Sequence, residues 1–249
     1  MHFYKKTTLC FLLPVIFSGS GDIVQIMQDP MVEQKKASSG NHYTIIYKGE
    51  ATTKFTTKRP DKKDKTILCC IAAAFTRLDD GKVDGVYAIE GKVSNIEFSN
   101  YHLGGGILLN DKGCEIFPIK LQPSSPESSK IFPLSPELQK KITEGKYSFF
   151  QQIQLIVNGK AEKFKDTQLF QRRAVVILND KKVAIIESAE PITLAAFSTD
   201  LVELGAYNAL YTDMGAWDEG WYRTDKGIKI IGTSKSQTEK QSNWVVFVK

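Results

Sequence analysis

Ala174-Val175-Val176-Ile177-Leu178, Asn179-Asp180-Lys181-Lys182 and Val183-Ala184-Ile185-Ile186 follow one another in the second half of the chain. The first and third runs are apolar and rich in β-branched residues, which favour strands. The polar run between them is typical of a tight turn. This stretch therefore predicts a β-hairpin whose strands are buried in a sheet.

Similar runs on either side of the hairpin predict further strands. They cover residues 43–47, 85–89, 106–109, 116–119, 152–157, 209–213, 228–231 and 244–248. Two helices are indicated by their caps: Ser135 and Pro136 begin one that ends at Gly145, and Thr193 begins one that ends at Gly205. Many strands and few helices predict an α+β fold, a single domain with a mixed, mostly antiparallel β-sheet.

The first twenty residues have the pattern of a signal peptide. Lys5 and Lys6 precede an apolar run to Phe17, and small residues follow it. A buried N-terminal helix is the alternative, which Pro14 disfavours. We expect a signal peptide at 1–20, a polar tether at 21–41 and one domain at 42–249, in an exported protein located in the periplasm or outside the cell, with no transmembrane segment in the mature chain.

The composition narrows the classes of function. The 249 residues are 42% hydrophobic and 24% charged, which excludes a disordered chain. Lys and Arg number 33 against 28 Asp and Glu, and removal of Lys5 and Lys6 would lower the net charge from +5 to +3. The run from Lys54 to Lys65 is basic, but we interpret it as a solvated loop because Phe55 is its one aromatic residue. We therefore expect no nucleic-acid partner; the oligomeric state stays open.

Three cysteines would remain after cleavage, Cys69, Cys70 and Cys114. Cys69 and Cys70 lie in the apolar run 67–75 and would face opposite sides of a strand. Burial as small apolar residues is the favoured interpretation, and a bridge to Cys114 is the alternative. The spacing of these cysteines and of the two histidines, His42 and His102, does not fit a zinc site.

The stretch from Tyr211 to Arg223 carries the chemistry. It holds the carboxylates Asp213, Asp218 and Glu219, and the aromatic residues Trp217 and Trp221. Carboxylates serve as general acids, bases or nucleophiles, and aromatic rings pack on sugar faces. The alternative is a polar loop whose aromatic residues pack on the core.

Four blocks of sequence resemble the bacterial phosphodiester glycosidase family. They are Tyr87 to Asn95 with Leu103 to Ile107, Phe150 to Gly159, Arg172 to Ile177, and Asn208 to Gly215. Glu90 stands where the family usually has asparagine, Met214 replaces the first glycine of Asp-Gly-Gly, and the Gln-Ser-Gly-Pro segment lacks its glycine and proline here.

The resemblance implies an exported hydrolase that cleaves a sugar 1-phosphodiester or a related glycoconjugate. Asp213 and Glu90 would be catalytic carboxyl groups, and Arg172 would clamp the phosphate, whereas Arg173 is expected to be exposed. The expected substrate-binding residues are Asn95, Gly105, Gln151, Gln152, Gly215, Trp217, Asp218, Glu219 and Trp221. No cofactor is expected, although the question of a divalent cation bound at the acidic loop stays open.

A second hypothesis is a noncatalytic carbohydrate-binding or envelope-associated protein with the same fold. The altered segments at Gln151 and Met214 motivate it. Turnover of a sugar phosphodiester by the purified protein would separate the two hypotheses.

Overall fold

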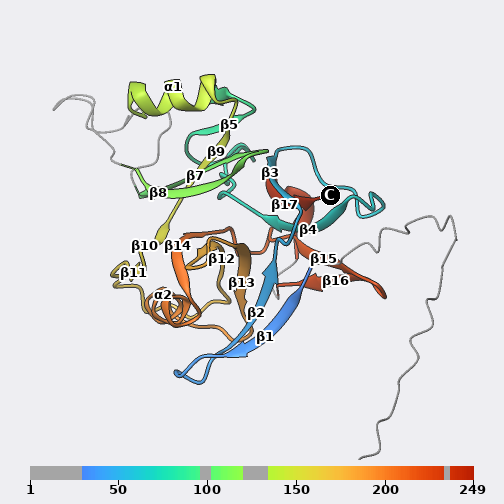
Figure 1. Ribbon diagram of the computed structural model, residues 1–249, viewed down its shortest axis with the longest axis vertical. Coiled ribbons are helices and arrows are strands. Elements are labelled where there is room, and N and C mark those ends of the chain that lie inside the picture. The colour runs from blue at the N-terminus through green and yellow to red at the C-terminus, as the bar shows by residue number, and fades with distance from the viewer. Residues whose placement is uncertain (1–29, 96–101, 120–133, 233–235) are drawn as a thin grey trace, which may run out of the picture.

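The strands form three antiparallel sheets in the computed structural model, which describes residues 30–95, 102–119, 134–232 and 236–249 (Figure 1). The largest sheet has seven strands, in the order β1 (Val32–Lys36), β2 (His42–Tyr47), β13 (Val183–Ser188), β12 (Arg173–Leu178), β14 (Ala206–Tyr211), β10 (Gln154–Val157) and β11 (Lys160–Ala161). The hairpin of β12 and β13 is confirmed and lies near the middle of this sheet.

Two sheets of five strands complete the architecture. One runs β16 (Gly227–Ile231), β15 (Gly220–Thr224), β4 (Ile67–Ala72), β17 (Trp244–Val248) and β3 (Thr52–Thr56). The other runs β6 (Lys92–Ser94), β5 (Tyr87–Ile89), β9 (Ser148–Gln152), β7 (Gly105–Asn110) and β8 (Gly113–Pro118). Below they are called the β4 sheet and the β9 sheet.

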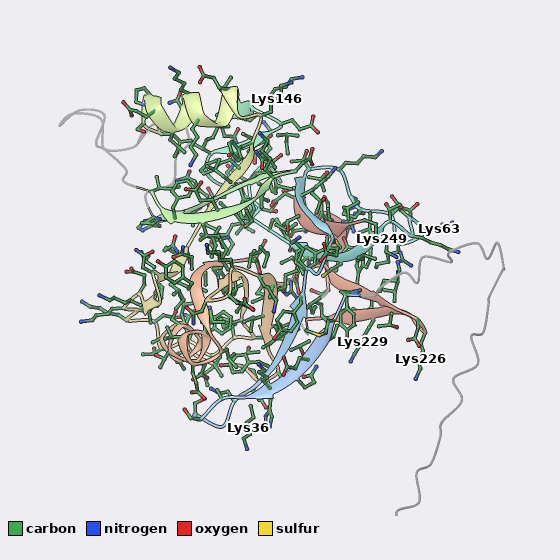
Figure 2. The ribbon with its side chains drawn as sticks, in the orientation of Figure 1. Lys36, Lys63, Lys146, Lys226, Lys229 and Lys249 are labelled. Atoms are coloured by element: carbon green, nitrogen blue, oxygen red, sulfur yellow. The ribbon has the colours of Figure 1, made fainter. Side chains whose placement is uncertain are left out.

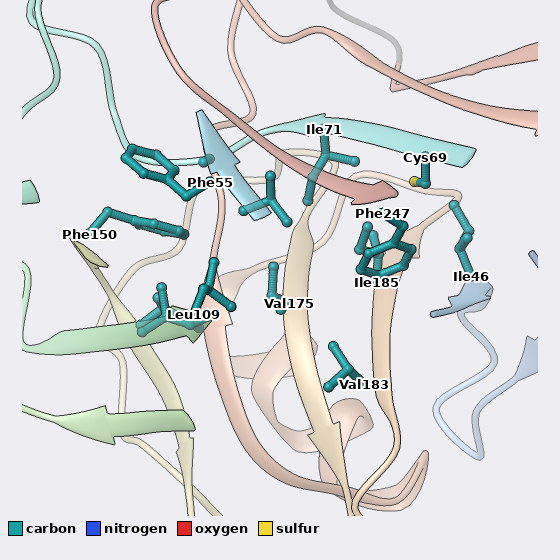
Figure 3. Packing of buried hydrophobic residues seen from close by; sticks show 14 of the residues in the cluster. Ile46, Phe55, Cys69, Ile71, Leu109, Phe150, Val175, Val183, Ile185 and Phe247 are labelled. Atoms are coloured by element: carbon teal, nitrogen blue, oxygen red, sulfur yellow. The ribbon is translucent and has the colours of Figure 1, made fainter. Parts of the chain in front are cut away.

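One apolar core joins the three sheets. Val175 and Ile185 of the seven-stranded sheet, Phe55 of the β4 sheet and Phe150 of the β9 sheet belong to one cluster of buried side chains (Figure 3). The Phe55 and Phe150 rings lie 4.9 Å apart between their centroids. Full burial of side chains of this size contributes about 1.5–3 kcal/mol each, so this cluster holds the sheets together.

The two helices begin and end as their caps predict. In α1 (Pro136–Glu144) the Ser135 hydroxyl accepts a hydrogen bond from the N–H of Leu138. In α2 (Leu194–Glu203) the Thr193 hydroxyl accepts one from Ala196, and Gly205 follows with φ +92°. A short 3₁₀ helix, η2 (Thr238–Lys240), precedes β17.

The expected α+β class is wrong. Within the described residues the fold is mostly β, and α1 and α2 pack against different sheets instead of forming a layer (Figure 1). The expected mixed sheet is also wrong, because all strand pairs among the described residues are antiparallel. Local sequence identified both helices, but the fold class depends on how much of the remaining chain pairs as strands.

Several boundaries near the N-terminus also change. Val32–Lys36, expected within the tether, is strand β1 paired with β2. Residues 54–56, expected to begin a loop, belong to β3. The predicted signal peptide lies outside the described residues. No helix in the described part of the chain is both long and apolar enough to span a membrane.

Cys69 and Cys70 are buried as small apolar residues, and Cys114 is partly buried. Cys69 points into the core shared by the three sheets, and Cys70 points to the opposite face of β4, beside Trp221. Both are free thiols, as is Cys114. Burial raises the pKa of Cys69 to about 12, which disfavours thiolate chemistry at neutral pH.

Candidate functional site

Arg173 is the centre of a buried ion cluster. It is the first residue of β12, and its side chain is fully buried. Its Nε donates to Glu187 Oε2 at 2.6 Å, and its Nη1 and Nη2 donate to Asp218 Oδ1 and Oδ2 at 2.7 and 3.0 Å. The expectation that Arg173 is exposed is therefore wrong, because β15 and the loop before it cover this end of β12.

The two carboxylates keep Arg173 charged. Burial alone would lower its pKa, but Asp218 and Glu187 outweigh burial and raise it. A Cβ on Gly220 would lie 2.8 Å from Arg173 Nη2, so the guanidinium packs directly on the start of β15. The cluster thus ties β12, β13 and β15 together.

Asp213 lies beside this cluster, just after β14. Its N–H donates to Ala73 O at 2.9 Å. The adjacent Ala74 is held by Asn243, whose Oδ1 accepts from Ala74 N at 2.7 Å and whose Nδ2 donates to Ala74 O at 3.1 Å. Asp213 is therefore fixed between the ends of β14 and β4 and the segment before β17.

The pKa of Asp213 is raised from 3.8 to about 7. Burial is the largest cause, and the negative charge of Asp218 is the next. Hydrogen bonds from the backbone N–H groups of Thr76 and Met214, and the charge of Arg173, oppose the shift without cancelling it. Asp213 can therefore gain or lose a proton near neutral pH, while the Asp218 carboxylate is held in an ion pair.

The segment after Ala73 links Asp213 to two of the expected binding residues. Val83, which pairs with Thr76, accepts a hydrogen bond at 3.0 Å from Asn95 Nδ2. Gln151 Oε1 accepts from Val86 N at 2.8 Å. Asn95 and Gln151 thus support the loop that contributes the Thr76 N–H to Asp213.

Gln152 lies close to the same end of β14. Its neighbour Ile153 accepts the N–H of Tyr211 at 2.9 Å. Gln152 is fully buried, its Oε1 accepts from Ile153 N, and its Nε2 has no partner. It pairs across strands with Gly105, where a Cβ would lie 2.4 Å from Leu210 Cδ1, so this position has room for glycine alone.

The residues of the acidic loop have different partners. A Cβ on Gly215 would lie 3.9 Å from Asp213 Oδ1, so Gly215 faces that carboxyl. Trp217 is partly exposed and donates from Nε1 to Gln237 Oε1 at 3.1 Å. Glu219 binds Arg59 at 2.5 Å. The expected role of Trp221 as a sugar platform is wrong, because Trp221 belongs to β15 and is fully buried.

Glu90 does not join Asp213. It is exposed in the turn between β5 and β6, with φ 48°, and its N–H donates to Ser148 Oγ at 3.2 Å. Ser148 begins β9, whereas Gln152 near Asp213 ends it, and five strand residues span about 13 Å. The predicted pairing of Glu90 with Asp213 is therefore wrong.

Arg172 is already occupied by partners within the chain. Its Nη2 donates to Asp166 Oδ2 at 2.8 Å and to Gln168 O at 3.0 Å, and its Nε donates to Ile192 O at 3.2 Å. The guanidinium also lies 5.2 Å from the centroid of the Phe170 ring. This arrangement fits internal packing rather than the predicted phosphate clamp.

Sequence reasoning missed Glu187 and Asn243. A hairpin with its turn at residues 179–182 pairs Arg173 with Glu187, so the register carried a signal for this opposite-charge pair. Asn243 gave no comparable signal, since its partners on Ala74 are distant in sequence.

The described residues contain no group of three or more His, Cys, Asp or Glu side chains placed to hold a metal ion. Two shallow hollows, of about 470 Å³ between β8 and α1 and about 490 Å³ on the β15–β16 hairpin, contain neither Asp213 nor Asp218. The chemistry of Asp213 therefore defines the candidate site better than surface shape does.

The fold is similar to that of known structures. One is the catalytic domain of zebrafish N-acetylglucosamine-1-phosphodiester alpha-N-acetylglucosaminidase, auto-inhibited by its pro-peptide, with a TM-score of 0.56 and 13% identity over 88% of this chain and 81% of that one. The chain shares the fold of this catalytic domain. A hypothetical protein from Synechocystis has a TM-score of 0.50 and 12% identity, over 88% of this chain and 62% of that one. No family model and no curated protein sequence matches. At these identities the likeness concerns the fold alone.

Proposed function

We propose that this chain is a hydrolase that cleaves the glycosidic bond of a sugar 1-phosphodiester. The observation that carries the proposal is the pair of unlike carboxyl groups: Asp213 has a pKa near 7, and Asp218 beside it is held by buried Arg173. A carboxyl group with a pKa near 7 is suited to donate a proton to a leaving group, and the fixed charge of Asp218 helps to keep that pKa high. The name of the zebrafish relative describes this reaction, and the sequence blocks around Asp213 resemble the same family.

In the proposed reaction the bond between the anomeric carbon and the bridging phosphate oxygen breaks. Protonated Asp213 donates its proton to that oxygen, which leaves as part of a phosphomonoester. Water adds to the anomeric carbon and releases a proton to the ionised Asp213, which restores the acid. The negative charge of Asp218, which is held by Arg173, acts through Asp213: it raises the pKa of that carboxyl and so keeps the acid protonated.

Hydrolysis of a synthetic aryl sugar 1-phosphodiester by the purified protein tests the proposal. Asp213→Asn should lower turnover about 100-fold or more, since general acid catalysis contributes at least that factor. Asp225→Asn is the matched control, because Asp225 is exposed in the β15–β16 hairpin. Equal turnover by the wild type and Asp213→Asn would contradict the proposal.

The pH profile tests the role of Asp213 separately. Because the protonated form is the active one, turnover should fall as the pH rises through about 7. A rate that increases across this range would assign Asp213 as a base and reverse the proposed direction of proton transfer.

A noncatalytic carbohydrate-binding protein is the second candidate. It is favoured by one observation: Glu90, the expected second acid, lies at the far end of β9 from Asp213. Calorimetric binding of a sugar 1-phosphate, together with no turnover by the wild type, would support this candidate over the hydrolase.

We also propose that the protein is exported, on the pattern of Lys5, Lys6 and the apolar run before Ser18. Intact mass of the protein recovered from the periplasm of a bacterial host should correspond to loss of about the first twenty residues. Retention of the full mass in the cytoplasm would contradict export.

A further inference from the structure

A rigid basic segment, residues 57–66, crosses one face of the β4 sheet and is called the strap below. Arg223 of β15 fixes it, with Nη2 donating to Lys62 O and to Asp64 O, both at 2.9 Å, and Nε donating to Ile67 O at 3.1 Å. Arg59 fixes it from the other side, since its guanidinium lies 5.2 Å from the centroid of the Trp244 ring. The strap is therefore held in a fixed position, although most of its residues are exposed to solvent as a solvated loop predicts.

The strap presents its positive charge to solvent. Between Lys58 and Lys65 it has five basic and two acidic residues, all exposed. The two acids cap turns: Asp61 Oδ1 accepts from Lys63 N at 2.8 Å, and Asp64 Oδ1 accepts from Thr66 N at 2.9 Å. The two carboxylates thus accept hydrogen bonds from the backbone of the strap, and the lysine ammonium groups extend outward. Lys63 is labelled at the right edge of the molecule in Figure 2.

Hydrogen bonds and a cation–π contact connect the strap to the loop that carries Asp213. Arg59 Nη2 donates to Thr238 O at 2.5 Å. Gln237, next to Thr238, donates from its N–H to Ala216 O at 2.9 Å and accepts from Trp217 Nε1. Lys240 lies over the Trp217 ring, 5.5 Å from its centroid. A continuous line of cations and one partly exposed ring thus leads from the Asp213 loop to the strap.

Nearby acids do not neutralise this line. Glu219 lies between Arg59 Nη1 at 2.5 Å and Lys62 Nζ at 3.5 Å, so one carboxylate serves two cations. Glu239 in η2 is exposed beside Lys240 and offsets that lysine alone. A net positive charge remains along the strap.

From this geometry we infer that the strap and Lys240 form an extended subsite for a linear polyanion, so that the substrate is a phosphodiester-linked chain whose further phosphates lie along Trp217, Lys240 and Lys62. The inference rests on the proposed function for the identity of the bond that is cleaved. Cations spaced along a track favour a chain with repeated phosphates, since each neutralised phosphate contributes to affinity.

A membrane surface fits the strap less well. The large apolar side chains that are strongly exposed within the described residues are Met31, Leu78, Leu169, Phe170, Tyr207 and Ile230. None of these belongs to the strap or to residues 236–243, and stable attachment to a bilayer requires an apolar or lipid anchor besides charge.

Binding of linear polyphosphate of about fifteen units, measured by calorimetry, tests the subsite. The variant Lys58→Gln/Lys62→Gln/Lys240→Gln should bind about tenfold more weakly or worse, with a shallower dependence on salt. The control Lys36→Gln/Lys112→Gln/Lys160→Gln removes the same charge from exposed positions outside the strap, and should bind like the wild type. Equal weakening of both variants, or of neither, would overturn the inference.

Two further measurements separate the alternatives. Sedimentation with anionic vesicles should not depend on the strap lysines. If the strap lysines were needed for vesicle binding and polyphosphate did not bind, the ligand of the strap would be a membrane surface and the inference would be overturned. The strap variant should also show a much larger rise in KM for a glycosyl phosphodiester oligomer than for the short aryl substrate. Absence of all turnover would contradict the proposed function, whereas the polyphosphate result would stand by itself.

Discussion

Arg172 and Arg173 are neighbours in sequence at the start of β12, yet their side chains lie in two different environments. Arg173 is fully buried between the carboxylates of Glu187 and Asp218. Arg172 points the other way, toward one partly exposed carboxylate, Asp166, and several neutral oxygens. Alternation along a strand separates them, and the elements packed on each face decide which arginine belongs to the candidate site.

Replacement of Arg173 should lower the free energy of unfolding more than any other change at this site. Arg173→Met leaves Glu187 and Asp218 without their cation, and removal of one partner from a buried ion pair costs about 3–5 kcal/mol. Urea denaturation should show this loss in the free energy of unfolding. Lys182→Met, in the turn of the same hairpin, is the control and should leave that free energy unchanged. A loss no larger than that of the control would mean that the cluster does not hold β12 to β15.

Gly220→Ala tests the packing of the same cluster without removing a charge. The new Cβ would lie 2.8 Å from both Arg173 Nη2 and Ile231 Cγ1, so the guanidinium has to shift. Overpacking of this kind costs about 1–3 kcal/mol. Gly104→Ala is the control, since nothing lies within 4 Å of its Cβ. Equal unfolding midpoints for the two variants would contradict the close packing.

Asp213→Asn measures how the Arg173 cluster acts on its neighbour. The pKa of Asp213 is about 7 in the folded chain against 3.8 for the free side chain, so the folded state binds more protons between these values. Stability of the wild type therefore falls as the pH rises from about 4 to about 7. Asp213→Asn should be more stable than the wild type by up to about 4 kcal/mol at pH 8, and this difference should vanish near pH 4.

The same denaturation series with Asp225→Asn provides the reference. Its difference from the wild type should stay constant between pH 4 and pH 8, since Asp225 is exposed. A constant difference for Asp213→Asn as well would mean that Asp213 titrates like a surface carboxyl.

The sequence predicts those parts of the molecule that depend on local signals. The hairpin of β12 and β13 and the caps at Ser135 and Thr193 are decided by residues within a few positions of one another. Strand β1 is not predicted, because an edge strand with solvent beside it can be as polar as a loop.

The site is only partly predictable for the same reason. Asp213 is found because an acid after an apolar strand is a local pattern. The burial of Arg173 depends on Asp218 and Gly220, more than forty residues away, and the burial of Trp221 depends on its pairing with β4. The residues next to Arg173 and Trp221 in the chain give no signal that predicts either contact.

Arg172→Met should give the smallest loss in the free energy of unfolding. The substitution leaves Asp166, whose side chain is 32% exposed, free to bind water, while the oxygens of Gln168 and Ile192 lose a donor. The methionine side chain can keep part of the contact with Phe170. The expected loss is about 1 kcal/mol by urea denaturation, with turnover of the short phosphodiester substrate unchanged. If turnover instead falls while stability holds, Arg172 contacts the substrate, and the assignment of the two arginines is reversed.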